Sequence, residues 1–128
     1  MNENELSHLI IGAAIEVHRE LGGPGLLEEL YEEALCCELE MRHVEVQRQV
    51  PIPVIYKGRT LSKSYRRDLL VGGLVIVECK ATEEDNVLYR AQCLTQLRLT
   101  ELKLGLVINF GNRFLKDGVH RVVNGLSE

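Results

Sequence analysis

Two carboxylates and one lysine lie at the ends of two neighbouring apolar segments. Asp68 opens the first segment, and Glu78 and Lys80 close the second, which runs over 74–80. Alternate residues of a β-strand share a face, so Glu78 and Lys80 leave the strand on the same side. Burying a carboxylate and an ammonium group in a core strand is costly unless they are paired or bind a metal ion. These residues are what a Mg²⁺-dependent phosphodiesterase requires, and they predict a metal site at Asp68 and Glu78.

Asp68 and Glu78 can share a metal ion only if both side chains leave the same face of the hairpin that joins their strands. Residues paired across antiparallel strands share a face. A tight two-residue turn would pair Asp68 with Val77 and direct it away from Glu78. An odd-numbered loop, such as 71–73, pairs Asp68 with Ile76 and restores the shared face. We therefore predict a three-residue loop with a bulge at this turn.

One glutamate falls on the apolar side of a helix predicted over about 26–41. At about 100° per residue, one arc of this helix is apolar and the opposite side is acidic. The arc contains Leu27, Leu30, Tyr31, Ala34, Leu35 and Leu39, and the solvated side contains Glu29, Glu32 and Glu33. Glu28 lies inside the arc. It either interacts with the positive end of the helix, worth about 0.5 kcal/mol, or is a third acid directed at the metal. Glu38 also lies in the arc, and we predict a structural salt bridge for it.

A second helix, predicted over about 85–101, carries a polar stripe. Tyr89, Gln92 and Gln96 lie at positions i, i+3 and i+7, which share a side of a helix. The stripe borders a predicted apolar face of Val87, Leu88, Ala91, Leu94 and Leu97. It is either an exposed flank or a surface that orients substrate near Lys80.

Basic residues are concentrated just before Asp68. Residues 42–67 hold seven bases and one acid, whereas residues 1–41 hold ten acids and one base. This block is either the solvated face of a hairpin or an edge that contacts phosphate beside the acids. In the second interpretation Lys63, Arg66 and Arg67 bind the substrate. The net charge of −4 argues against a protein that coats nucleic acid.

The elements that position these residues follow from hydrophobic periodicity. Helical spacing predicts helices over about 5–21, 26–41 and 85–101, and apolar runs predict strands over about 44–52, 54–56, 64–71, 74–80 and 104–110. Pro51 and Pro53 indicate an edge position or a bulge. A short C-terminal hairpin is predicted within 113–123, around Asp117-Gly118. The order ααββββαβ indicates an α/β fold, with helices packed on a mixed sheet.

Length and composition limit the remaining possibilities. A chain of 128 residues predicts a single domain over 1–128, and no apolar run approaches the roughly 20 residues of a membrane span. The acidic N-terminus is unlike a signal peptide. Four cysteines without C-x-x-C spacing suit a reducing compartment. We therefore expect a cytoplasmic protein without membrane contact.

The pattern of Asp68 followed by Glu78-x-Lys80 resembles the PD-(D/E)XK nuclease superfamily, with arginine at residue 67 in place of the motif proline. The run Gly25-Leu-Leu-Glu28-Glu-Leu-Tyr31 is similar to the signature of the GxxExxY protein family. Other matching runs are Ala13–His18, Tyr31–Leu35, Asp68–Val71, Glu78–Ala81 and Gly105–Gly111. The resemblance covers nearly the whole chain.

This resemblance implies a restriction-endonuclease-like core in which a helical glutamate, an aspartate, a Glu-x-Lys and a Gln-x-x-x-Tyr helix converge. It implies that Glu28 is the helical acid and Gln92 the motif glutamine, with Gln96 at the tyrosine position. The implied catalytic residues are Glu28, Asp68, Glu78, Lys80 and Gln92, with metal ligands Asp68, Glu78 and Glu28. From the basic block and the polar stripe, we expect the substrate-binding residues to be Lys63, Arg66, Arg67, Tyr89 and Gln96.

The implied activity is Mg²⁺- or Mn²⁺-dependent hydrolysis of nucleic acid, with DNA favoured over RNA. Hard cations take oxygen ligands, so the Cys79 carbonyl is expected to join Asp68 and Glu78. Lys80 is expected to position water or stabilise developing charge. Two alternatives stay open. One is an inactive nucleic-acid-binding or structural module on the same fold, and the other is a subunit that gains specificity from a partner or as a homo-oligomer.

Overall fold

The computed structural model of the protein describes residues 1–127, which form a mixed five-stranded sheet covered by three α-helices. The elements in chain order are α1 (Glu3–Glu20), α2 (Glu28–Met41), β1 (Val46–Tyr56), β2 (Arg59–Val71), β3 (Val75–Lys80), α3 (Val87–Thr100), β4 (Leu104–Asn109), the 3₁₀ helix η1 (Leu115–Gly118) and β5 (Val119–Val123). The sheet order is β1-β2-β3-β4-β5, with β3 and β4 parallel and the other neighbours antiparallel. The predicted α/β class is confirmed.

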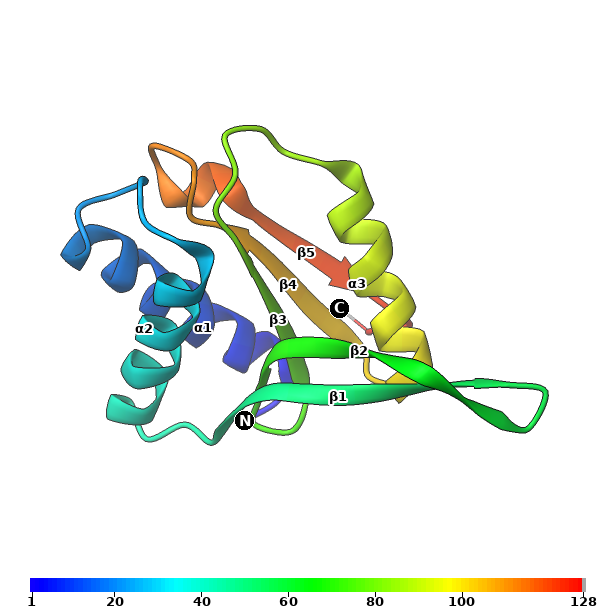
Figure 1. The fold of residues 1–128 in the computed structure, drawn as a ribbon. Coiled ribbons are helices and arrows are strands. Elements are labelled where there is room, and N and C mark those ends of the chain that lie inside the picture. Colours follow the sequence, from blue (N-terminus) through cyan, green and yellow to red (C-terminus); the bar gives the residue numbers. More distant parts are fainter. Residues whose placement is uncertain (128) are drawn as a thin grey trace.

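The sheet separates two apolar cores. Figure 1 shows α1 and α2 on one side of the sheet and α3 on the other. Residues of β3 alternate between the two cores: Val75, Val77 and Cys79 contribute to the α1–α2 side, whereas Ile76 contributes to the α3 side. Because both faces are covered, β3 and β4 are apolar almost throughout, as expected of a parallel pair joined by a crossover helix.

The first helix begins at a capping box. The side chain of Asn2 accepts a hydrogen bond from the Glu5 amide at 2.8 Å, and the Glu5 carboxylate accepts one from the Asn2 amide at 3.1 Å. These two bonds satisfy amide groups that a helix start leaves unpaired. They place the start of α1 at Glu3, two residues before the predicted start.

Two details of the predicted strand order are wrong. The segments 44–52 and 54–56 form one strand, β1, because the chain passes Pro53 with a register shift between Pro53 and Ile55 rather than a break. Asp117-Gly118 lies in η1 instead of a hairpin turn. The last strand, β5, pairs antiparallel with β4, so the C-terminal hairpin is formed by β4 and β5.

The turn between β2 and β3 has the predicted parity. Val71 pairs with Val75, which leaves a three-residue loop at 72–74. Gly72 and Gly73 both have positive φ angles, 59° and 69°, which other residues rarely adopt. The loop lies one residue later than predicted, and the register is continuous over its three pairs, so the predicted bulge is not required.

The buried faces of α2 and α3 differ from the predicted ones by a rotation about the helix axis. On α2, Glu32 is buried, whereas Leu27 and Leu30 are exposed. Glu32 can be buried because β1 supplies its partners. On α3, the buried residues are Cys93, Gln96 and Leu97, and Val87 and Leu88 are exposed. This face approaches β4 closely, since a side chain at Gly105 would collide with the Cys93 sulfur.

Within residues 1–127, no helix has both the length and the apolar character needed to cross a membrane.

Candidate active site where two strands separate

The site forms where β2 and β3 stop pairing. The last pair between these strands is Leu69 with Val77, and continuing the register would set Asp68 opposite Glu78. Instead, Asp68 Oδ2 accepts a hydrogen bond from the Cys79 amide at 2.7 Å. The Asp68 side chain thus accepts a hydrogen bond from the Cys79 amide, which the backbone of β2 does not pair with at this point. It is held at the point where the sheet opens, so the predicted proximity of Asp68 and Glu78 is found.

The backbone of β1 is distorted directly across from Asp68. Gln49 has a positive φ of 52° and falls at the gap in the β1–β2 ladder between the Arg48 and Val50 pairs. Its side-chain amide donates to Glu32 Oε1 at 2.8 Å, and Arg48 donates to Glu32 Oε2 at 2.9 Å. A left-handed conformation at a residue other than glycine is costly and needs such support. The buried carboxylate of Glu32 therefore fixes the strand beside Asp68.

Glu78 is the more buried acid of the Asp68–Glu78 pair. Its exposed fraction is 7%, and its Oε1 atom has no hydrogen-bond partner. Burial raises the pKa of Glu78, and the neighbouring Asp68 raises it further. Burial is also the main reason that the pKa of Asp68 is raised. The hydrogen bond from the Cys79 amide lowers this pKa in part. Two desolvated carboxylates this close favour a shared proton or a bound cation.

Gln96 lies against Glu78 from α3. Its exposed fraction is 5%, and its Oε1 atom also lacks a hydrogen-bond partner. A hydrogen bond from its side chain lowers the pKa of Glu78 in part. Gln96 is therefore an inward residue of the site. A second buried oxygen without a partner at the same place is a further sign that the site is built to hold a polar or cationic group.

Lys80 follows Glu78 on the same face, as predicted. Its Nζ lies 4.7 Å from the centre of the Tyr89 ring on α3. A lysine over an aromatic face is held by about 0.5–1 kcal/mol when partly exposed. Within residues 1–127, no ion pair joins Lys80 to a carboxylate, although its charge lowers the pKa values of Asp68 and Glu78 in part.

These side chains surround one hollow of about 210 Å³. It is lined by Tyr65, Arg66, Asp68, Glu78, Lys80, Tyr89, Gln92, Cys93 and Gln96. The structure thus brings together most of the predicted site. Glu28, Lys63 and Arg67 do not line this hollow.

Glu28 approaches from the other side of the sheet, at the start of α2. Burial raises its pKa and the charge of Lys80 lowers it, so the two groups interact electrostatically. The start of α2 is fixed by Tyr31, whose hydroxyl donates to the Gly23 carbonyl at 2.6 Å and accepts from the Leu26 amide at 3.2 Å. The ring of Tyr31 stacks on Phe110 with centres 4.7 Å apart. Tyr31 therefore anchors the helix that carries Glu28.

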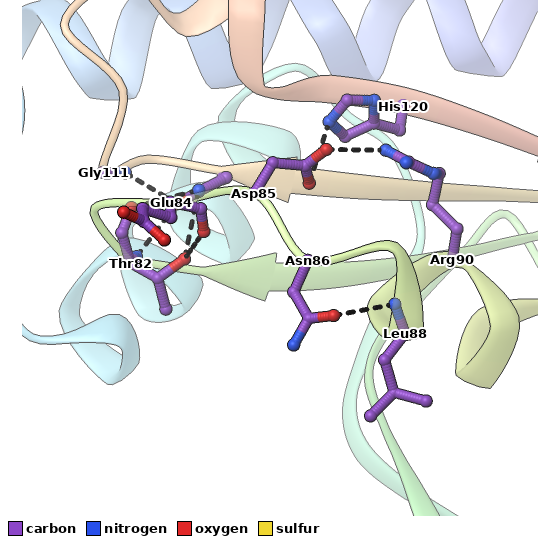
Figure 2. A network of polar contacts seen from close by, with 9 residues as sticks. Thr82, Glu84, Asp85, Asn86, Leu88, Arg90, Gly111 and His120 are labelled. Carbon is purple, nitrogen blue, oxygen red and sulfur yellow. Dashed lines mark hydrogen bonds and ion pairs between the residues drawn. The ribbon is translucent and has the colours of Figure 1, made fainter.

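The segment after Lys80 is held by a polar network that sets the start of α3 (Figure 2). Asn109 Oδ1 accepts from the Thr82 amide at 3.0 Å, and Asn109 Nδ2 donates to the Thr82 carbonyl at 3.1 Å. The Asn86 side chain caps α3 by accepting from the Leu88 amide at 2.9 Å. Figure 2 shows Asp85 between Arg90 and His120, and its carboxylate contacts them at 2.9 Å and 3.4 Å. This network orients the helix that carries Tyr89, Gln92 and Gln96.

The predicted basic residues divide between surfaces. Arg66 lines the hollow with Asp68, whereas Lys63 lines a second hollow farther along the hairpin of β1 and β2. Arg67 has a buried Nε without a hydrogen-bond partner, and burial lowers its pKa. The charge of Glu78 raises the pKa of Arg67 in part, so these two groups interact electrostatically although Arg67 does not line the hollow.

Sequence reasoning missed three residues that shape the site: Glu32, Tyr65 and Asn109. Glu32 lies four residues after Glu28 and three before Leu35, which is the spacing of one helix face and could have marked it as inward. For Tyr65, the only signal in the sequence was its position next to Arg66 in a predicted strand. Asn109 ends an apolar strand, but its partner Thr82 is 27 residues away, so no local pattern identifies the contact.

Cysteine does not supply a nucleophile here. Cys93 lines the hollow, and burial raises its pKa to about 12. Burial also raises the pKa of Cys79 well above its ordinary value. Both thiols are thus protonated at neutral pH and are weak nucleophiles.

The residues present fit a divalent cation. Asp68 and Glu78 supply adjacent carboxylates, and Glu78 Oε1 is buried without a partner. Mg²⁺ is commonly held by one or two carboxylates and keeps several waters. Among residues 1–127, no group of three or more His, Cys, Asp or Glu side chains is arranged to hold a metal ion. The acidic side chains that line the hollow are Asp68 and Glu78.

A mixed sheet with an acidic pair and a lysine at the edge of its central strands defines a class of α/β proteins with a nuclease fold. The family model of the PD-(D/E)XK nuclease superfamily matches residues 4–122. The chain belongs to this superfamily, as the motif around Asp68, Glu78 and Lys80 predicted. Comparisons with curated proteins and with solved structures gave no match.

Proposed function

We propose that this protein is a metal-dependent nuclease that hydrolyses phosphodiester bonds in DNA. The observation that carries the proposal is the buried Asp68–Glu78 pair, with the unpartnered Glu78 Oε1, beside Lys80 in one hollow. Two acids with raised pKa values beside a cationic side chain suit phosphoryl chemistry. Superfamily membership supports nucleic acid as the substrate.

Each residue of the site has a proposed role. Asp68 and Glu78, with the Cys79 carbonyl, hold Mg²⁺ or Mn²⁺, which when bound neutralises phosphate charge and acidifies water. Lys80 donates to the attacked phosphate or to the attacking water. Glu28, at the start of α2, interacts electrostatically with Lys80 and thereby influences the charge at the site. Gln92 and Gln96 orient the substrate and Glu78.

Further expectations join this proposal. The motif Gly25-x-x-Glu28-x-x-Tyr31 supports membership of the GxxExxY family within the superfamily. Residues 1–128 form a single domain, and the protein acts in the cytoplasm. Arg66 contacts phosphate at the hollow, and Arg67, whose charge interacts with that of Glu78, binds the substrate beside it.

A cleavage assay tests the proposed activity. Single- and double-stranded DNA and RNA are incubated with Mg²⁺, with Mn²⁺ and with chelator. We expect metal-dependent cleavage that Asp68→Ala abolishes and that Asp117→Ala, an exposed aspartate outside the site, leaves unchanged. Cleavage that persists in chelator or in Asp68→Ala would refute the proposed mechanism.

Calorimetry tests the metal site independently of activity. We expect Mg²⁺ and Mn²⁺ to bind, with affinity at least about tenfold weaker in Glu78→Ala, because a ligand carboxylate is lost. Equal binding in the two proteins would remove Glu78 from the ligand set.

A second candidate function is nucleic-acid binding without turnover. The replacement of the motif tyrosine by the buried Gln96 favours it. Metal and nucleic-acid binding without cleavage of any of the four substrates would select this function.

A further inference from the structure

The hairpin of β1 and β2 continues well past the site. We use "the arm" for residues 50–67, the part of this hairpin that begins at the Val50–Arg67 pair next to Asp68. Figure 1 shows the tip of the arm standing clear of the other elements. The arm holds five bases and no acid, whereas the rest of the chain holds ten bases and nineteen acids. A basic projection on an acidic protein fits a polyanionic partner.

The arm also exposes large apolar and aromatic side chains. The exposed fractions are 62% for Ile55, 58% for Tyr56, 47% for Leu61 and 37% for Tyr65. Large exposed hydrophobic side chains also occur elsewhere on the surface, but on the arm they stand among five bases and no acid. Contacts with duplex DNA are made largely to phosphates by charged and polar groups. The exposed aromatic and apolar groups of the arm therefore require a partner with accessible apolar or π surfaces.

A groove on the arm leads to the catalytic hollow. The groove has a volume of about 630 Å³ and is lined by Val54 and by residues 61–65, including Lys63 and Tyr65. Tyr65 lines both this groove and the hollow that contains Asp68 and Glu78. The two depressions thus adjoin at Tyr65, and Lys63 lines the groove whereas Arg66 lines the hollow.

We propose that the arm binds a single-stranded segment of nucleic acid and leads its backbone toward Asp68 and Glu78. Tyr65 stacks on an unpaired base at the junction, and Lys63 and Arg66 contact the phosphates on either side. Proteins that bind single strands combine a basic groove with aromatic stacking platforms, because only unpaired bases offer a free face. The catalytic half of this inference rests on the proposed function, whereas the binding half does not.

The test is fluorescence anisotropy with a labelled oligonucleotide that lacks self-complementarity, compared with the same strand annealed into a blunt duplex. Chelator prevents cleavage during the measurement. We expect the single strand to bind at least about tenfold more tightly than the duplex. Tyr65→Ala weakens single-strand binding by roughly 5- to 150-fold, the range for loss of one stacked base.

Two variants control for indirect effects. Tyr65→Phe keeps the ring and is expected to bind within about twofold of the wild type, since stacking needs no hydroxyl. Phe114→Ala removes an exposed aromatic side chain on the loop after β4 and is expected to leave binding unchanged. Lys63→Ala is expected to reduce the slope of log affinity against log salt by about 0.7, the value for one phosphate contact on a single strand.

Three results would overturn the inference: duplex binding as tight as single-strand binding, unchanged binding by Tyr65→Ala, or an arm that instead joins two copies of the chain. The last would appear in sedimentation as a dimer that Tyr65→Ala dissociates. Failure of the nuclease proposal looks different, because arm-dependent binding then persists while no substrate is cleaved. If Tyr65→Ala left cleavage of duplex DNA unchanged, the proposed nuclease activity would stand and the proposed binding role of the arm would be refuted.

Discussion

The ammonium group of Lys80 lies over the ring of Tyr89 and makes no ion pair with a carboxylate within residues 1–127. A lysine whose purpose was to neutralise the buried acids would contact them directly, because an unpaired buried charge is costly. Tyr89 instead holds Lys80 at the edge of the hollow. At the scale of single residues, this contact favours the proposed catalytic role of Lys80 over a structural one.

We expect Lys80→Ala to fold normally, bind Mg²⁺ with nearly unchanged affinity and lose cleavage by at least about 100-fold, a typical loss for one transition-state donor. Circular dichroism, calorimetry and single-turnover cleavage report these three properties. Lys103→Ala, an exposed lysine before β4, is the matched control and should retain activity. An unfolded Lys80→Ala protein, together with an inactive wild type, would assign the lysine a structural role.

The acidic pair makes the stability of the metal-free protein depend on pH. The pKa values of Asp68 and Glu78 are raised from 3.8 and 4.5 to about 7 and about 8. The folded protein therefore binds these protons more tightly than the unfolded chain. This contribution is complete below the ordinary pKa values and is lost as pH rises through the raised ones.

We thus expect the free energy of unfolding in chelator to fall by about 2 kcal/mol or more between pH 5 and pH 8. Urea denaturation at several pH values measures it. The double variant Asp68→Asn, Glu78→Gln lacks both titrating groups and should show a markedly flatter profile. The same slope in both proteins would place the titration elsewhere.

At the scale of elements, Asn109 connects three parts of the fold. It ends β4 beside Lys80 in the parallel register, and its side chain bonds Thr82 in the segment before α3. The same oxygen accepts from the Gly111 amide at 2.9 Å. A side chain at Gly111 would collide with the Thr82 backbone, so the two loops pack in direct contact.

We expect Asn109→Ala to lower stability by about 2–4 kcal/mol, because two amide groups lose their acceptor in a buried place. Hydrogen exchange should speed up at 82–88, while β3 stays protected. The control Thr95→Ala removes an exposed hydroxyl from α3 and should change stability little. Uniform loss of protection across the sheet would show that Asn109 supports the whole fold rather than this segment.

At the scale of the whole molecule, the proposed metal site links cation binding to folding. A cation that binds the folded chain and not the unfolded one stabilises the protein by about 2.7 kcal/mol at one hundred times its dissociation constant. The coupling is favourable here because the cation relieves the repulsion between two buried carboxylates.

We expect Mn²⁺ or Mg²⁺ to raise the melting temperature by several degrees in a saturable manner, more at pH 8 than at pH 6, where protons compete with the metal. Differential scanning calorimetry measures the shift. Glu78→Gln should abolish it, whereas Glu33→Gln, an exposed glutamate on α2, should preserve it. A shift of equal size in Glu78→Gln would locate the metal away from the pair.

Much of this architecture was predictable from the sequence, because it depends on local periodicity. The apolar spacing placed the three helices, and the continuous runs before Lys80 and Asn109 placed the two buried strands. Parity alone required an odd loop for Asp68 and Glu78 to share a face, and the loop at 72–74 has that parity. The motif predicted the superfamily that the comparison shows.

Only the tertiary structure decided which sides of α2 and α3 are buried and which residues surround Asp68 and Glu78. The buried side of α2 includes Glu32 because β1, 16 residues away at Arg48, supplies a partner. The buried side of α3 includes Gln96 because Gly105 lets the helix approach β4. Such contacts join residues distant in sequence, and their energy depends on burial and partner geometry rather than on spacing. The sequence therefore determined which side chains could do chemistry, and long-range packing determined which of them meet.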